Sequence, residues 1–293
     1  MAGRPLHAAV LPTGPELLSL VRAALDGGPA ILPIDPGLPA AARNRLIGTL
    51  CPAAVVTGAG RYDLTEGVPV DADVAVVIAT SGSTGEPKGV ELTAAALLYS
   101  AGAALDRVGA RPGDRWLCCL PTSHVGGLQV LVRSVVAGTE PVLVERFSVA
   151  AVAAVVEAGS AEHTALVPTT LRRLLDAGVD LARFRSVLVG GAALSRDLLD
   201  RAAGAGVRVI STYGMTETAG GCVYAGRPLD GVDVSVGDDG RIRITGPLLA
   251  RGYRLRPDLT AESFVAGWLV TPDVGLLGTD GRLEVLGRAD DVI

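Results

Sequence analysis

The sequence predicts an α/β fold in which layered, mostly parallel sheets are covered by helices and a smaller β part follows. Two observations predict it. Over the first two-thirds of the chain, short apolar runs rich in β-branched residues alternate with Ala- and Leu-rich helical stretches, as in a parallel sheet buried on both faces. After about residue 221 the segments VDVSVGDDGRIRITG and LLGTDGRLEVLG each indicate a strand, an Asp-Gly turn and a second strand.

The elements follow from these patterns in chain order. Strands are expected at 30–34, 53–57, 74–79, 116–120, 142–145, 186–189 and 207–211. Helices are expected at 15–25, 39–50, 93–108, 149–158, 169–177 and 195–203. We therefore divide the chain into an α/β part (1–220), a small β subdomain (221–287) and a terminal segment (288–293).

Composition narrows the class of protein. The chain has 293 residues and a net charge of −5 without a Lys/Arg block, which disfavours an extended nucleic-acid or anionic-membrane surface. Its four cysteines show no CxxC spacing, which favours buried thiols in a reducing, cytoplasmic setting. Neither a signal-peptide core nor a run of about 18 apolar residues occurs, so no membrane insertion is expected.

The segment TSGSTGEPKG, residues 80–89, directly follows an apolar strand. Its glycines and hydroxyl residues allow backbone N–H groups to surround phosphate oxygens, and Lys88 adds a mobile positive charge. Pro87 precedes the lysine, so this is not the Walker loop. A flexible surface turn is the alternative, but the order Thr-Gly-x-Pro-Lys-Gly after a buried strand favours a phosphate loop. The candidate contacts are Thr80, Ser81, Gly82, Ser83, Thr84, Gly85 and Lys88.

Four further segments occur in a characteristic order: LVGGAAL (188–194), STYGMTET (211–218), GWLVTPDVG (267–275) and GRADD (287–291). With the phosphate loop, they resemble the adenylate-forming superfamily of acyl-CoA synthetases, luciferases and peptide-synthetase adenylation domains. The resemblance covers about residues 30–293 and implies the large N-terminal domain of that fold. It also implies ATP, Mg²⁺ and coenzyme A as co-substrates.

The resemblance assigns roles to the middle segments. Gly190, Gly191 and Ala192 would line the adenine and acyl pocket, although Gly-Gly after a strand is by itself an ordinary tight turn. Glu217 would bind Mg²⁺ through a hard carboxylate oxygen, whereas outside this motif it would be a surface carboxylate. Tyr213 would stack on adenine and Thr216 would bind the α-phosphate, within an ATP-contacting run that comprises Thr212, Tyr213, Gly214, Met215 and Thr216.

The last two segments depart partly from the family pattern. Asp273 would bind both ribose hydroxyls, but Pro272 stands where the family commonly has Gly, which fixes φ and removes a donor. Arg288 would contact the ribose or a phosphate, and Asp290 would be the hinge to a C-terminal domain that carries a catalytic lysine. The chain stops after a Val-Ile pair that looks like the start of a strand, so we expect a fragment that lacks this domain.

The segment LPTSHVGGLQVLVRSVVAG, residues 120–138, bears on the acid substrate. By resemblance, His124 lies at the acyl pocket, and Gly126 opens a helix that places Arg133 about two turns in. Separately, His124 could be a core histidine and Arg133 part of a solvated helix face. Together with PTTLRRLL and the short N-terminal region, they resemble the o-succinylbenzoate:CoA ligases of menaquinone synthesis. Arg133 would then bind a second carboxylate, and His124, Gly126, Arg133, Gly191 and Gly214 would contact the acid.

The resemblance implies a two-step reaction: the carboxylate attacks the α-phosphorus of Mg-ATP, and CoA then displaces AMP. Thr216, Glu217, His124 and Lys88 are the candidate catalytic residues, acting by alignment and charge neutralisation. Alternatives are another acyl- or aryl-acid:CoA ligase, a peptide-synthetase adenylation domain, or an acyl-adenylate binding fragment without turnover. A nicotinamide dehydrogenase is disfavoured because no GxGxxG joins a first strand to a helix. The expected partners are the acid, ATP and CoA, and a homodimer stays open.

Overall fold

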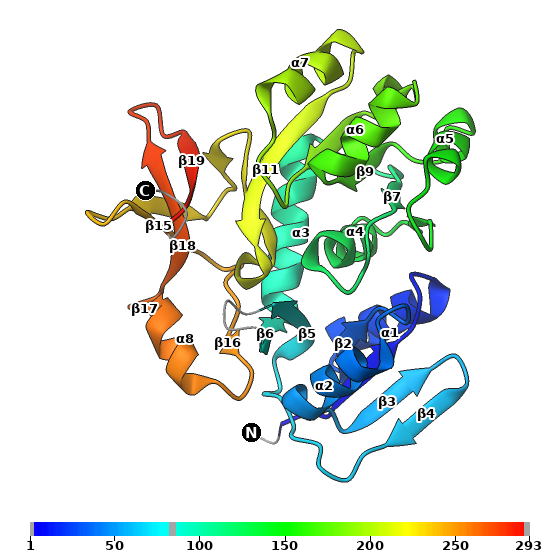
Figure 1. Ribbon diagram of the computed structural model, residues 1–293, viewed down its shortest axis with the longest axis vertical. Coiled ribbons are helices and arrows are strands. Elements are labelled where there is room, and N and C mark those ends of the chain that lie inside the picture. The colour runs from blue at the N-terminus through cyan, green and yellow to red at the C-terminus, as the bar shows by residue number, and fades with distance from the viewer. Residues whose placement is uncertain (1–2, 82–85, 290–293) are drawn as a thin grey trace.

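The computed structural model describes residues 3–81 and 86–289 (Figure 1). Three sheets organise the chain. The first runs in the order β16 (Gly252–Tyr253), β6 (Pro87–Thr93), β5 (Val74–Ser81), β2 (Ala30–Ile34), β1 (Leu6–Val10), β3 (Ala54–Thr57) and β4 (Gly60–Asp63). The second runs β13 (Arg227–Pro228), β12 (Gly220–Tyr224), β11 (Val209–Met215), β10 (Ser186–Val189), β9 (His163–Leu166), β7 (Trp116–Cys118) and β8 (Val142–Leu143).

Both large sheets are parallel in their centres; the first is antiparallel at both edges, and the second only at its β12–β13 edge, since β8 pairs in parallel with β7. β1 pairs in parallel with β2 and β3, and β9 pairs in parallel with β10 and β7. The third sheet is antiparallel and consists of β14 (Asp233–Val236), β15 (Arg241–Thr245), β18 (Trp268–Leu277), β17 (Phe264–Val265) and β19 (Leu283–Arg288). The expected fold class, with its parallel-rich sheets and two Asp-Gly hairpins, is confirmed.

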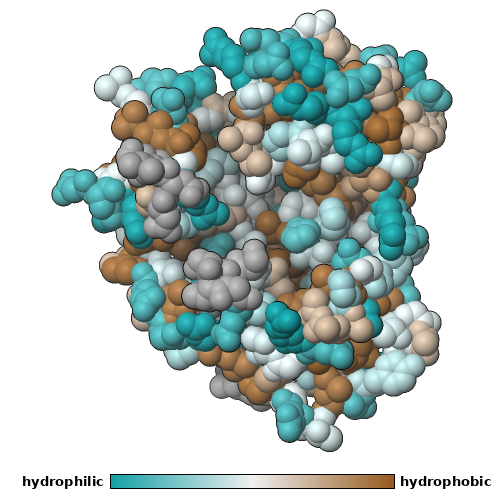
Figure 2. Space-filling model, in the orientation of Figure 1, coloured by the Kyte–Doolittle hydropathy of each residue, from teal (hydrophilic) through white to brown (hydrophobic). Residues whose placement is uncertain are grey.

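Helices fill the layers between and outside the sheets (Figure 1). The largest apolar cluster lies between the two large sheets, where α1 (Pro15–Leu25), α3 (Ala94–Val108) and α4 (Val125–Val136) are buried. α2 (Ala40–Leu50) covers the outer face of the first sheet. α5 (Val149–Glu157), α6 (Pro168–Asp176) and α7 (Arg196–Gly204) cover the outer face of the second. Hydrophilic residues cover the upper edge of the molecule in Figure 2, over α7.

Local sequence signals set the helix ends. α3 begins where the Thr93 side chain accepts a hydrogen bond from the Ala96 N–H, and it ends at Gly109, whose φ of 71° is left-handed. Ser148 and Ser195 cap α5 and α7 in the same way. All six expected helices therefore form within one or two residues of their predicted bounds.

The expected strands also form, but several elements were not anticipated. β1, β4, β6, β9 and the short helix α8 (Pro257–Ser263) had no prediction. β12 and β13 extend the second sheet, and the third sheet begins with β14, so the division of the chain at residue 220 stays a prediction. In the residues that the structure describes, no helix is long and apolar enough to cross a bilayer.

Candidate active site

A cavity of about 1060 Å³ opens at the carboxyl ends of β9, β10 and β11, beside the N-terminus of α4 and the end of β5. Parallel sheets bind ligands at this edge. Most predicted site residues line it: Thr80, Lys88, His124, Gly126, Arg133, Gly190, Gly191, Thr212, Gly214, Met215, Thr216, Glu217 and Arg288. Ala192, Tyr213 and Asp273 do not line it. Residues 82–85, Asp290 and the Ser81 side chain lie outside the described part.

Two glycines make the cavity wall possible. A Cβ on Gly190 would lie 2.2 Å from Thr212 Oγ1 and 2.9 Å from the Thr212 carbonyl oxygen. A Cβ on Gly214 would lie 2.1 Å from the Gly220 carbonyl oxygen. Both positions therefore need glycine so that β10, β11 and β12 can approach each other. The wall they form has no side chain at these points, which suits a flat ring lying against the backbone.

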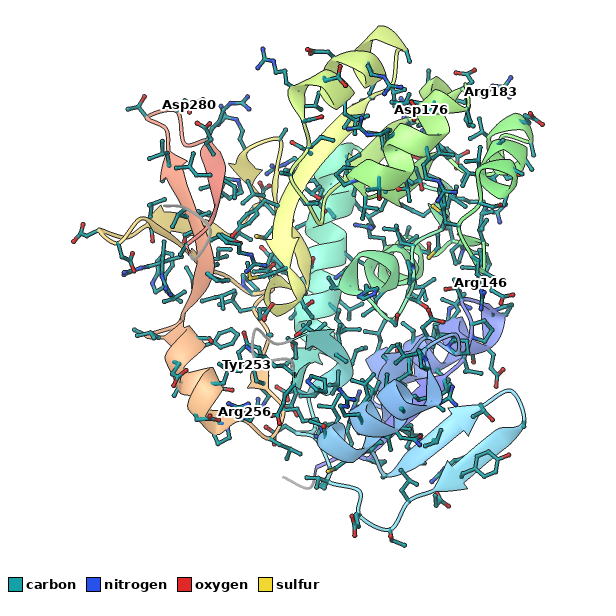
Figure 3. The ribbon with its side chains drawn as sticks, viewed as in Figure 1. Arg146, Asp176, Arg183, Tyr253, Arg256 and Asp280 are labelled. Carbon is teal, nitrogen blue, oxygen red and sulfur yellow. The ribbon has the colours of Figure 1, made fainter. Side chains whose placement is uncertain are left out.

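The two strands that flank the predicted phosphate loop pair with each other. Thr80 and Lys88 face each other across the β5–β6 hairpin, so Lys88 is held by a strand rather than by a loop. Its Nζ lies 5.7 Å from the centre of the Tyr253 ring. Tyr253 lies between α8 and the β5–β6 hairpin in Figure 3. The Tyr253 hydroxyl donates a hydrogen bond of 2.7 Å to Glu217 Oε1, and burial and this carboxylate raise the pKa of Tyr253.

Glu217 and Glu262 are acidic residues that line the cavity, and Glu217 lies next to Thr216 in the chain. In the part of the chain that the structure describes, no group of three or more His, Cys, Asp or Glu side chains could hold a metal ion. Mg²⁺ in nucleotide sites commonly takes one or two carboxylates, with phosphate oxygens and water completing its shell. Glu217, on the cavity wall with Thr216 and Lys88, fits a Mg²⁺ that arrives with ATP.

The side chains of Asp273 and Tyr213 are hydrogen-bonded to each other. The Tyr213 hydroxyl donates a hydrogen bond of 2.9 Å to Asp273 Oδ2, and Arg288 Nε lies 3.2 Å from Asp273 Oδ1. Burial raises the pKa of Tyr213, and the Asp273 charge adds to the effect. Both carboxylate oxygens thus have protein partners, while Pro272 rather than Asp273 lines the cavity. The adenine role of Tyr213 and the ribose role of Asp273 stay predictions.

At the opposite end, α4 presents His124 and Arg133. His124 is the N-cap residue of α4 and is exposed on the cavity wall, so it is not a core histidine. Arg133 is only 5% exposed, so it is not on a solvated helix face. Gln129, one turn before Arg133, also lines the cavity, and its Nε2 donates to the Ala219 carbonyl oxygen at 2.7 Å.

The surroundings of Arg133 are aromatic and apolar. Its Cζ lies 4.4 Å from the centre of the Trp116 ring, and its Nε has no hydrogen-bond partner among the described residues. Burial lowers the pKa of Arg133, while the Tyr224 phenol and the Cys118 thiol partly oppose this. Arg133 is therefore a buried cation that faces the cavity without a carboxylate partner in the described part of the chain.

Four residues at the cavity were not predicted from the sequence: Gln129, Tyr224 and Tyr253 on its wall, and Trp116 behind Arg133. The position of Gln129 could have been predicted. It precedes Arg133 by four residues, so the two side chains lie on the same face of a helix, and that face was already predicted to contact the acid through Arg133. The position of Tyr253 could not, because a two-residue strand far along the chain brings it to Glu217.

The AMP-binding enzyme family matches residues 63–254. A probable 2-succinylbenzoate–CoA ligase of Mycobacterium tuberculosis is 47% identical over 271 residues, covering 86% of this chain and 69% of the relative. The 2-succinylbenzoate–CoA ligase of Listeria monocytogenes is 35% identical over 233 residues, covering 75% of this chain but only 50% of the relative.

Among solved structures, the o-succinylbenzoate coenzyme A synthetase of Bacillus subtilis in complex with AMP superposes with a TM-score of 0.87. Its sequence identity is 27%, and the match covers 100% of this chain and 88% of that chain. The same enzyme has been solved with ATP and a magnesium ion and with its acyl-adenylate intermediate. The family match covers more than half of the chain, which therefore belongs to the AMP-binding enzyme family, confirming the resemblance to adenylate-forming enzymes.

Proposed function

We propose that the chain activates o-succinylbenzoate as an acyl-adenylate in an ATP-dependent, AMP-forming acid:CoA ligase of menaquinone synthesis. The chain spans about half the length of most of the curated relatives it matches, and 69% of the M. tuberculosis relative. The observation that carries the choice of acid is Arg133, a buried cation on the wall of the cavity. An acid with a second carboxylate would supply the missing counter-charge.

The arrangement supports an order of ligands along the cavity. The phosphates of ATP lie near Thr80, Lys88 and Thr216, and Glu217 would hold the Mg²⁺, which would offset phosphate charge. The acid lies between His124 and Arg133. Its reacting carboxylate oxygen attacks the α-phosphorus, the bond to the bridging oxygen breaks, and pyrophosphate leaves. In the second half-reaction the CoA thiolate attacks the acyl carbon and AMP leaves.

These residues act on charge and alignment rather than by forming a covalent intermediate. Lys88 neutralises charge on the phosphate oxygens and Thr216 orients them by hydrogen bonding, while Tyr253 orients Glu217 through its hydrogen bond. His124, exposed at the N-terminus of α4, orients the reacting carboxylate. A cytoplasmic location and a homodimer stay predictions.

The test is calorimetric titration of the 293-residue chain with two non-hydrolysable acyl-adenylate analogues. One carries the o-succinylbenzoyl group, and the other carries a benzoyl group without the second carboxylate. We expect a preference of at least about tenfold for the first, equivalent to ~1.4 kcal/mol, which Arg133→Met abolishes. Arg173→Met is the matched control, since Arg173 also lies over an aromatic ring, Phe147, but on the surface.

Equal affinity for the two analogues, or tighter binding of the benzoyl compound, would overturn the choice of acid. Pyrophosphate release from ATP and o-succinylbenzoate separates turnover from binding alone. An absence of release despite tight binding would identify this chain as an acyl-adenylate binding unit.

A further inference from the structure

Behind Arg133 a line of contacting side chains crosses the second sheet from the cavity to the protein surface. Trp116 of β7 and His163 of β9 are register partners on neighbouring strands, and their rings stack with centroids 4.9 Å apart and planes 28° apart. The Arg133 guanidinium lies over the Trp116 ring. Both rings are completely buried, so the Arg133 charge rests on an aromatic platform that water does not reach.

Hydrogen bonds fix the far side of this platform. His163 Nδ1 lies 2.7 Å from Ser186 Oγ and His163 Nε2 lies 3.0 Å from Asp114 Oδ2. Arg185 Nη1 donates to both oxygens of Asp114, at 2.9 and 3.1 Å. The imidazole is thus held at both nitrogens, and its ring plane cannot rotate without breaking one of these bonds. The Ser–His–Asp grouping is buried, so it is not a hydrolytic site.

On the cavity side the Arg133 guanidinium has fewer polar partners, and the Tyr224 phenol is one of them. Arg133 Nε has no partner in the described residues, and the long arginine side chain has many rotamers in the absence of a contact. Trp116 is the aromatic face against which the guanidinium packs, and Trp116 Nε1 has no hydrogen-bond partner either. Stacking on Trp116, together with the neighbouring Tyr224 phenol, therefore sets the position of the Arg133 charge.

We propose that Trp116 and His163 are positioning residues that set specificity for an acid with a second carboxylate, by holding the Arg133 guanidinium ready at the cavity wall. This inference rests on the proposed function, because it assumes that Arg133 meets that carboxylate. Neither ring lines the cavity, so each acts through Arg133. If the Arg133 side chain is ordered before the acid binds, binding does not carry the entropy cost of ordering it.

The test measures discrimination, defined as the ratio of the dissociation constants of the benzoyl- and o-succinylbenzoyl-adenylate analogues. We expect Trp116→Leu to lower it about threefold to tenfold, with ATP affinity changed less than about threefold. Trp116→Phe keeps an aromatic face and should restore most of the discrimination. Phe147→Leu is the control, since it removes the half-buried aromatic ring beneath the exposed Arg173.

A double-mutant cycle separates positioning from a general structural role. In an Arg133→Met background, Trp116→Leu should not weaken binding of the o-succinylbenzoyl analogue any further, because the tryptophan acts only through the arginine. Losses that add, or a Trp116→Leu protein that loses ATP affinity to the same degree, would overturn the proposal. A wild-type protein that does not discriminate would overturn the proposed function as well. Normal wild-type and Arg133→Met results with unchanged discrimination in Trp116→Leu would overturn only this inference.

A second measurement does not depend on whether Trp116→Leu folds. The chain has two tryptophans, Trp116 and Trp268, so the Trp268→Phe variant reports Trp116 fluorescence alone. Binding of the o-succinylbenzoyl analogue should change this emission, because its second carboxylate attracts the Arg133 guanidinium and so changes the electric field at the Trp116 ring. The benzoyl analogue should change it much less. Equal changes with both analogues would overturn the coupling.

Discussion

Arg133→Met should stabilise the free protein while it weakens acid binding. Arg133 is 5% exposed and has no carboxylate partner among the described residues, so the fold bears the desolvation cost of its charge. Replacing buried ions with hydrophobic residues of similar volume is often neutral or stabilising by about 1–4 kcal/mol. Loss of the stacking on Trp116 offsets up to about 2 kcal/mol of this gain.

The net expectation is a gain of about 1–2 kcal/mol in the free energy of unfolding. For a domain of this size that corresponds to a rise of roughly 2 to 6 °C in Tm. Urea unfolding followed by circular dichroism gives the free energy, and scanning calorimetry gives the Tm. Arg173→Met, at the exposed surface, should change stability by less than about 0.5 kcal/mol.

A clear loss of stability in Arg133→Met would refute this reasoning. It would mean that the arginine mainly packs α4 against the second sheet, as a structural residue would. The choice of acid would then lose its main physical support, because a structural cation needs no anionic ligand.

Three further outcomes are expected. Gly190→Ala should destabilise by about 1–3 kcal/mol in urea unfolding, because its Cβ would meet Thr212, whereas in Gly126→Ala the nearest atom is 3.5 Å away and stability should not fall. Burial lowers the pKa of His163 from its usual 6.5, so the imidazole binds a proton more weakly in the folded chain than in the unfolded chain. The free energy of unfolding, measured across pH, should therefore decline as pH falls below about 6.5. A colourimetric thiol reagent should modify Cys51 first, since the other three cysteines are buried.

Periodicity and capping signals predicted most of the fold, because they are local. Helix 15–25 starts with a proline and helix 93–108 has a threonine cap and a following glycine, and both form as expected. β9 was missed because His163 and Thr164 interrupt an otherwise apolar run. Both are completely buried through side-chain hydrogen bonds that only the assembled sheet provides.

In the candidate site, too, the positions set by local motifs could be predicted, whereas the contacts between distant segments could not. Lys88, Gly190 and Glu217 lie within short motifs whose spacing fixes their place at strand ends, and the structure brings them to one cavity. What these motifs cannot convey is what each side chain touches. Asp273 is held by Tyr213 and Arg288 rather than facing the cavity, a pairing across 60 residues that no local pattern encodes.

A charged side chain lies at each end of the cavity, and the two ends differ in how that charge is stabilised when no ligand is bound. At the phosphate end, Glu217 shares its charge with a hydrogen bond from Tyr253 and is partly open to solvent, so its cost without a ligand is modest. At the acid end, Arg133 is buried against Trp116, where water cannot screen its charge. An anion there gains the full low-dielectric attraction, whereas a neutral group leaves the arginine unpaired. The acid end therefore discriminates by the penalty of an unpaired buried charge, a penalty that Glu217 does not carry to the same degree.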